Sequence, residues 1–142
     1  MKTLAITNGD LTIGPGGAQL VEGQAKVRQD LGIALREPLG CDRFHPEWGA
    51  ILGRFIGVAH RIELMALVKA EVTRVTGGYM TRQTQMVQDD AIAGRRTRFR
   101  TGEVIATLSG VEVRPEYDRY LVRVSPETMP REQAALQATV RD

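Results

Sequence analysis

The residues with the greatest capacity for chemistry lie together in residues 37–49, EPLGCDRFHPEWG. A structural zinc site uses four ligands at recurring short spacings. Cys41 and His45, with His60 further along, form neither a CxxC nor an HxxxH pattern. We therefore expect no metal and no cofactor at these residues.

The carboxylates of the same segment suggest glycoside hydrolysis. Glu37 together with Glu47 or Asp42 would provide an acid and a base if the two carboxyl groups stood about 5–9 Å apart. The sequence fixes no such distance. Cys41 also lacks the neighbours typical of a catalytic thiol. We expect no catalytic residue here, and an inert, half-buried Cys41.

A structured turn between two helices accounts for the same residues. Pro46 lies just ahead of a helix that begins near Trp48, and Asp42 and Glu47 can accept hydrogen bonds from backbone N–H groups. Arg43 can pair with either carboxylate. The predicted structural turn motif, a scaffold and not an active site, consists of Asp42, Arg43, Pro46, Glu47, Trp48 and Gly49.

The elements on both sides must position this turn. Apolar residues recur at helical spacing over residues 24–36, and this pattern places Lys26 on the outer face. A short amphipathic helix is expected over residues 48–56, and a longer one from about Arg61, which Gly77-Gly78 interrupts. One apolar stripe of the longer helix is predicted to pack partly against another chain: Ile62, Met65, Val68, Val72 and Val75.

Strands are expected at both ends of the chain. Residues 1–22 read as a small β-meander in which Asn8-Gly9 forms a type I′ hairpin turn. Residues 104–114 and 119–124 alternate as a second hairpin, with pairing expected to end near Pro126. One face of its last strand is predicted to pair with another subunit through Tyr120, Val122 and Val124.

These elements predict an α+β fold: a helical middle with a small antiparallel or mixed sheet built from the N- and C-terminal strands. Residues 1–125 form one domain, and residues 126–142 a polar tail with a weak helical pattern over 134–140. The longest apolar run spans only residues 64–68, so neither a membrane span nor a secretory signal is expected.

The basic residues gather in one place. Arg95, Arg96, Arg98 and Arg100 lie within six residues, although the formal net charge is only +2. The cluster is interpreted as a solvated loop or as an ion-pair patch between subunits. Phosphate binding ranks behind both, because no Gly-rich cradle lies near.

The turn also carries a resemblance. Residues 27–35 and 37–52 resemble the baseplate wedge, or sheath initiator, family of phage tails and related contractile injection systems. That family shows a helix, a turn with Gly-acid-Arg, and then Pro-Glu-aromatic-Gly opening the next helix. Asp42-Arg43 and Pro46-Glu47-Trp48-Gly49 take those places, with Asp for the more usual Glu. The similarity extends over residues 4–125, but the family's Glu-Pro-Arg after the long helix is missing here.

The resemblance implies a structural virion protein. Such a subunit sits at the junction of baseplate and tail tube, bundles helices with other wedge subunits and lends a strand to the first sheath ring. The implied partners are therefore other baseplate wedge subunits and the tail tube or sheath protein, in a large symmetric assembly made in the host cytoplasm. Neither a membrane nor a nucleic acid is expected as a partner. Some members are labelled lysozyme-like, so a peptidoglycan hydrolase is the alternative.

Overall fold

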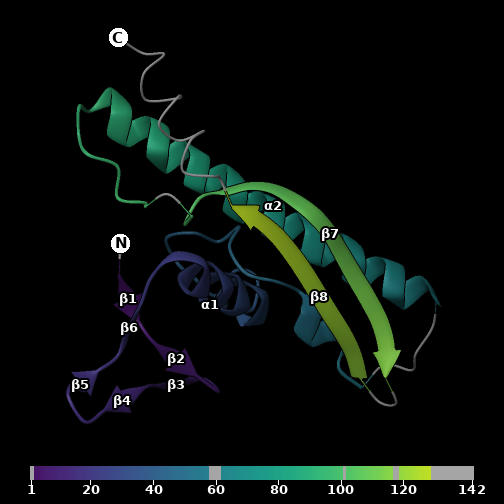
Figure 1. The fold of residues 1–142 in the computed structure, drawn as a ribbon. Coiled ribbons are helices and arrows are strands. Elements are labelled where there is room, and N and C mark those ends of the chain that lie inside the picture. The colour runs from purple at the N-terminus through teal and green to yellow at the C-terminus, as the bar shows by residue number, and fades with distance from the viewer. Residues whose placement is uncertain (1, 58–61, 101, 117–118, 129–142) are drawn as a thin grey trace.

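The computed structural model describes residues 2–57, 62–100, 102–116 and 119–128. It has an N-terminal arm of short strands, a helical middle and a long C-terminal hairpin (Figure 1). The α+β class is confirmed. The larger elements are α1 (Gly23–Arg36), the 3₁₀ helix η1 (Leu52–Phe55), α2 (Ile62–Ile92), β7 (Ile105–Glu116) and β8 (Arg119–Thr128).

The arm consists of six two-residue strands that pair antiparallel, β1 with β6, β2 with β3 and β4 with β5. Asn8 and Gly9 have φ of 54° and 93°, as the predicted hairpin turn requires. The strands are β1 (Thr3–Leu4), β2 (Ile6–Thr7), β3 (Asp10–Leu11), β4 (Ile13–Gly14), β5 (Gly17–Ala18) and β6 (Leu20–Val21).

Within the described residues the strands of the two chain ends pair in separate sheets, so the expectation of one common sheet is wrong. The arm is fastened to α1, where the Gln29 amide accepts a hydrogen bond from Ile6 N (2.8 Å) and donates one to Leu4 O (2.8 Å). The hairpin of β7 and β8 instead packs on α2 through β7. Since each set of strands is anchored to a different helix, neither edge reaches the other (Figure 1).

The α2 helix is continuous, so the expected interruption at Gly77-Gly78 is wrong. A glycine in a helix costs about 1 kcal/mol against alanine. Burial on both sides of the pair offsets that cost, because Val75, Thr76 and Tyr79 are all buried. The expected helix over residues 48–56 shrinks to the one turn of η1.

The C-terminal hairpin runs longer than predicted. Pairing continues past Pro126, which lies opposite Leu108, and reaches Thr128 opposite Ile105. The register shifts between Leu108 and Gly110, next to the proline. At such an irregularity a missing N–H interrupts the ladder less than in a regular strand, which accounts for the wrong end point. The predicted helical pattern over residues 134–140 lies outside the described residues.

The core lies where α1, α2 and the start of β7 meet. One cluster joins Val27 and Leu31 to Tyr79 and Ile105, and a second joins Ala34, Ala50 and Val75. Trp48 packs against both clusters, so the turn residue links them. No helix in the described part of the chain has the length and hydropathy needed to cross a membrane.

Candidate functional site

The turn between α1 and η1 is closed by backbone hydrogen bonds at its base. Ala50 N donates to Glu37 O (2.7 Å), and Leu39 N donates to Ala50 O (3.0 Å). Pro38 and Ala50 form an isolated parallel bridge. Because residues 37–39 and 50 lie side by side, the segment between them must return on itself as a closed loop.

Gly49 makes this closure possible. Its φ is +97°, a conformation that L side chains rarely adopt. A Cβ at this position would lie 2.7 Å from Glu37 O and 2.8 Å from Pro38 O. The last residue of the predicted motif is thus a glycine for both conformational and steric reasons.

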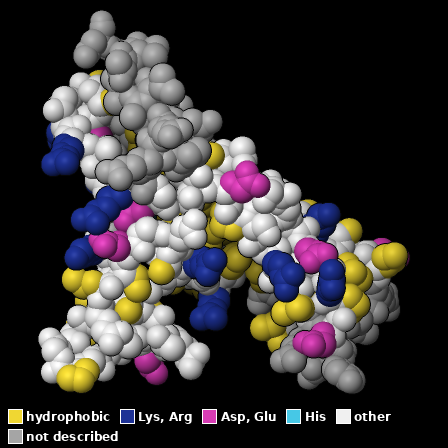
Figure 2. Space-filling view, viewed as in Figure 1, with side chains coloured by type: hydrophobic (Ala, Val, Ile, Leu, Met, Phe, Trp, Pro, Cys, Tyr) yellow, Lys and Arg dark blue, Asp and Glu magenta, His cyan; other side chains and the backbone are white. Residues whose placement is uncertain are grey.

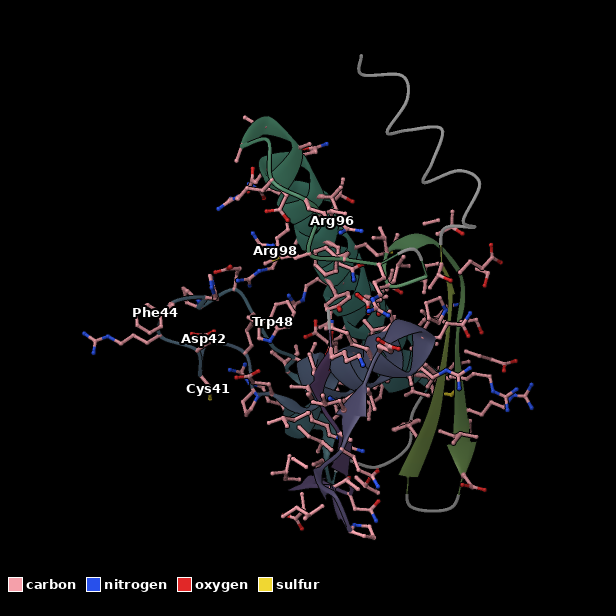
Figure 3. All side chains as sticks on the ribbon, turned by 60° about the vertical axis from the view of Figure 1, so that its left-hand side comes forward. Cys41, Asp42, Phe44, Trp48, Arg96 and Arg98 are labelled. Atoms are coloured by element: carbon pink, nitrogen blue, oxygen red, sulfur yellow. The ribbon has the colours of Figure 1, made fainter. Side chains whose placement is uncertain are left out.

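The tip of the loop is shaped by Asp42. Its carboxylate accepts hydrogen bonds from Phe44 N (2.8 Å) and His45 N (3.3 Å), which confirms the expected backbone role. Phe44 itself is 85% exposed and points away from the body (Figure 3). Arg43 is exposed and has no ion pair within the described residues, so its expected pairing is wrong. Cys41 is exposed and not half-buried.

Trp48 points back from the loop into the helices. Its indole Nε1 donates to Glu37 Oε2 (3.1 Å), and its ring centroid lies 6.0 Å from that of Tyr79 on α2. The Arg82 guanidinium lies 5.2 Å from the Trp48 ring centroid, within range of a cation–π interaction. One side chain of the turn therefore contacts the end of α1 and the middle of α2.

His45 adds a polar contact to the same place. Its Nε2 lies 2.6 Å from Arg82 Nη2. Because arginine only donates, Nε2 is the acceptor and the neutral ring carries its proton on Nδ1. That nitrogen lies 3.8 Å from the exposed Glu47 carboxylate. This distance is too long for a hydrogen bond, so His45 ties the turn to α2 through its contact with Arg82.

A second clamp joins the turn to α2 through residues that the sequence reading missed. Arg74 donates to Gly49 O (2.8 Å) and to the Glu71 carboxylate (2.7 and 2.8 Å), while Glu71 accepts from Ile51 N (2.8 Å). The hydrogen bonds from Arg74 hold the pKa of Glu71 below its ordinary value; burial opposes this, and the Ile51 amide adds to it. The i,i+3 spacing of Glu71 and Arg74 signals a helix pair, but not their contact with the turn.

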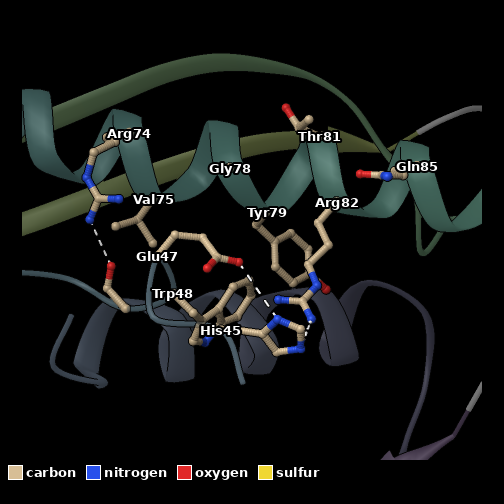
Figure 4. A pocket seen from close by; sticks show the side chains of 11 residues that line it. His45, Glu47, Trp48, Arg74, Val75, Gly78, Tyr79, Thr81, Arg82 and Gln85 are labelled. Carbon is tan, nitrogen blue, oxygen red and sulfur yellow. Dashed lines mark hydrogen bonds and ion pairs between the residues drawn. The ribbon is translucent and has the colours of Figure 1, made fainter. Parts of the chain in front are cut away.

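An open pocket of about 500 Å³ lies between the turn and α2 (Figure 4). Its walls include His45, Glu47, Trp48, Tyr79 and Arg82. Glu47 is the sole carboxylate among the lining residues. Glu37 accepts a hydrogen bond from Trp48, and Asp42 accepts hydrogen bonds from the loop backbone. Neither carboxylate lines the pocket, so neither Glu37 nor Asp42 faces Glu47 across it as a glycosidase pair would.

A buried polar network lies on the other side of Tyr79. The Tyr79 hydroxyl donates to Asp30 (2.9 Å), which also pairs with Lys26, a residue expected to face outward but only 4% exposed. Lys26 lies 5.8 Å from the Phe99 ring centroid, which covers it. Burial raises the pKa of Tyr79, and the nearby Asp30 carboxylate raises it further.

Glu103 closes this network at the start of the hairpin and is fully buried. It accepts from Gly23 N (3.1 Å) and Arg100 N (3.1 Å). Burial raises the pKa of Glu103, but hydrogen bonds, among them these two, outweigh it and keep the pKa below its ordinary value. Gln83 on α2 bonds both Glu103 O (2.8 Å) and Ile105 N (3.1 Å). Helix and hairpin are thus joined by buried amide contacts.

The arginine cluster makes ion pairs within the chain. Arg98 binds the buried Asp90 carboxylate through two nitrogens (2.8 and 3.0 Å), and Arg95 lies 3.6 Å from it. The bonds from Arg98 lower the pKa of Asp90 to about 2. Arg100 pairs with Glu22 (2.7 Å), ahead of α1. The loop after α2 is therefore held by ion pairs within the chain, while its four clustered arginines are exposed, as expected for a solvated loop. An ion-pair patch between subunits stays a prediction. Figure 3 labels Arg96 and Arg98 beside α2.

The predicted partner-packing stripe divides in two. Val68, Val72 and Val75 are 3%, 0% and 6% exposed, so these three belong to the chain's own core. Ile62 is 78% exposed and Met65 is partly exposed. Contact with another chain stays a prediction for the N-terminal end of α2 alone.

The predicted strand-pairing residues lie together as expected. Tyr120, Val122 and Val124 are all partly buried on β8, and the intervening Leu121 and Arg123 are exposed. Within the residues that the structure describes, no group of three or more His, Cys, Asp or Glu side chains could hold a metal ion; His60 lies outside them.

Neither a protein-family model nor a curated protein sequence matches this chain.

Proposed function

We propose that the chain is a structural subunit of a phage tail baseplate or tail tip. It joins wedge components to the tail tube or the first sheath ring by helix bundling and strand pairing. The proposal combines the resemblance in the turn with the way in which the turn's residues are used.

The observation that carries the proposal is the engagement of the turn's reactive side chains. Glu37, Asp42 and His45 are all bonded to Trp48, the loop backbone or Arg82. Together with Gly49 they hold the turn closed and against α2. A motif used in this way supports a scaffold, because a hydrolase needs two carboxylates facing one substrate.

The C-terminal hairpin offers the second support. Within the described residues β8 pairs only with β7, and α2 packs against β7, so the outer edge of β8 has no strand partner. An unpaired edge can accept a strand from another protein through backbone hydrogen bonds. The exposed Arg123 discourages indiscriminate pairing at this edge.

The start of α2 offers the third support. Ile62 is 78% exposed, and Met65, one turn further along the same side of the helix, is partly exposed. An exposed apolar helix end is a surface on which a helix of a wedge subunit can pack.

The test is a tail-assembly system in which this chain is the missing component. We expect added wild-type chain to restore complete tails, with density for it at the junction of baseplate and tube. Leu121→Glu, on the exposed face of β8, should block addition of the next component. Thr84→Glu, on an exposed face of α2, is the matched control and should not. Complete tails without the chain, or density elsewhere, would refute the proposal.

A further inference from the structure

Two prolines determine which backbone groups of the C-terminal hairpin point outward. Proline has no N–H, so a ladder accommodates it where its nitrogen faces away from the neighbouring strand. Pro115 on β7 lies opposite Tyr120 on β8. These two residues therefore form one of the non-hydrogen-bonded pairs of the antiparallel ladder, in which the N–H and C=O groups of both residues point away from the partner strand.

The same phase continues along β8. Hydrogen-bonded and non-hydrogen-bonded pairs alternate, so the pairs that Val122 and Val124 form with β7 are also of the outward kind. The irregularity near Pro126 adds its extra residue on β7, and the alternation of β8 passes through it. Pro126 fits this phase independently, since its nitrogen must also face outward. The free edge of β8 thus presents the N–H and C=O groups of Tyr120, Val122 and Val124, and it ends at the proline.

The exposed face of the hairpin adds a charge preference at this free edge. Basic and acidic side chains gather at the lower right of Figure 2, where Figure 1 places the hairpin. Glu112 lies opposite Arg123, but its carboxylate binds Arg114 (2.7 Å). Arg123 is exposed and forms no ion pair within the described residues. Its guanidinium can therefore pair with a carboxylate that approaches from the side of the free edge.

We propose that the free edge of β8 accepts an extended segment of another protein in which acidic and aliphatic residues alternate. The backbone of this segment bonds the outward groups of the edge, and one of its acidic side chains lies beside Arg123. Its aliphatic side chains continue the face of Val122 and Val124, which are only partly buried. The inference rests on the strand pairing of the proposed function and names the kind of strand that is accepted.

The charge at this edge disfavours other strands. Two copies of β8 paired antiparallel around Val122 would set Arg123 of one chain beside Leu121 of the other, which provides no carboxylate. A basic strand would place like charges side by side, and this is destabilising. A segment of about five to seven residues reaches along the whole free edge.

Hydrogen exchange of the backbone amides, followed by NMR on the full chain, tests the edge itself. In the free chain the amides of Leu121 and Arg123 should exchange slowly, because they bond β7. Those of Tyr120, Val122 and Val124 should exchange rapidly. A saturating capped heptapeptide that alternates valine and glutamate should slow the exchange of these three at least about tenfold. Slow exchange of the three before the peptide is added, as pairing between copies would give, would overturn the proposal.

Fluorescence anisotropy with labelled peptides at low salt tests the charge preference. The valine–glutamate heptapeptide should bind at least about fivefold more tightly than one that alternates valine and lysine. This difference should shrink as the salt concentration is raised. Arg123→Glu should reverse the preference, whereas Arg28→Glu, the same change of charge at an exposed position of α1, should leave it unchanged. Equal binding of the two peptides by wild type, or the same response in both variants, would overturn the proposal.

The peptide experiment and the tail-assembly experiment fail separately. A chain that restores complete tails but binds neither peptide at β8 supports the proposed function and refutes the acidic strand. A chain that binds the valine–glutamate peptide at this edge but does not restore tails refutes the proposed function, and the preference of the edge for an acidic strand stands.

Discussion

Replacing Gly49 with alanine tests how much the closed backbone of the turn contributes to the stability of the fold. The backbone at Gly49 has φ of +97°, which costs an alanine about 1–2 kcal/mol. The new Cβ would lie 2.7 Å from Glu37 O and 2.8 Å from Pro38 O, and both are backbone atoms that cannot rotate away. Moving them breaks the bonds between Ala50 and residues 37 and 39, each contributing about 0.5–1.5 kcal/mol.

Together these effects predict a loss of about 2–5 kcal/mol in the free energy of unfolding for Gly49→Ala. Urea unfolding followed by fluorescence measures this directly, because Trp48 is the only tryptophan and lies in the turn itself. Against a domain stability of about 5–15 kcal/mol this loss is large enough to lower the urea midpoint clearly.

Gly32→Ala is the matched control. Gly32 lies inside α1, has no positive φ, and has nothing within 4 Å of where its Cβ would be. Alanine there should stabilise the chain by about 0.5–1 kcal/mol. If Gly49→Ala lost less than about 1 kcal/mol, the turn would be adaptable and the reasoning from its backbone would be wrong.

Three further predictions concern single side chains. Asp90→Asn should lower the melting temperature at pH 7, because Arg98 then loses its carboxylate. Since the pKa of Asp90 falls from 3.8 to about 2 on folding, this stabilisation is complete above about pH 5 and is lost as the pH falls through about 2. The melting temperatures of wild type and Asp90→Asn should therefore converge between about pH 5 and pH 2, and a constant gap would contradict this. Glu47→Gln should change neither stability nor any peptidoglycan release, measured as soluble sugar, whereas robust cleavage by wild type that disappears in this folded variant would establish the hydrolase alternative. Arg82→Met should alter Trp48 fluorescence and destabilise the chain by about 1–2 kcal/mol through loss of the cation–π contact and the bond to His45, with Gln85→Met, on the same face of α2, as the unaffected control.

Local signals in the sequence were sufficient to predict the features that depend on short-range backbone preferences alone. Asn8-Gly9 predicted its turn because both residues tolerate positive φ. The first helix was predicted to within one residue, since its apolar spacing and Pro38 are both local. Asp42 was correctly predicted to bond the backbone, because its partners are only two and three residues away.

Long-range packing overrode local preference elsewhere. Gly77-Gly78 does not break α2, because the buried side chains on either side stabilise the helix by more than the glycines cost. Lys26 faces inward because Asp30 pairs with it and the Phe99 ring covers it, and Phe99 lies more than 70 residues away. Helical periodicity alone places Lys26 on the solvent-facing side of the helix, because the periodic pattern carries no information about a partner as distant in sequence as Phe99.

The sequence by itself determined the α+β class, the extent of the first helix and the composition of the turn. Only the tertiary structure decided what the turn contacts: Arg74 and Arg82 reach it from α2, 25 and 37 residues along the chain from Gly49 and His45. The same holds for the arm, where alternation predicted strands but not which face would be outward. Gln29 of α1 holds the backbone of the arm from one side. The aliphatic side chains left exposed on the arm are Leu4, Ile6, Leu11, Ile13 and Leu20. Local conformation follows from neighbouring residues, whereas the partner of a side chain depends on how the helices pack.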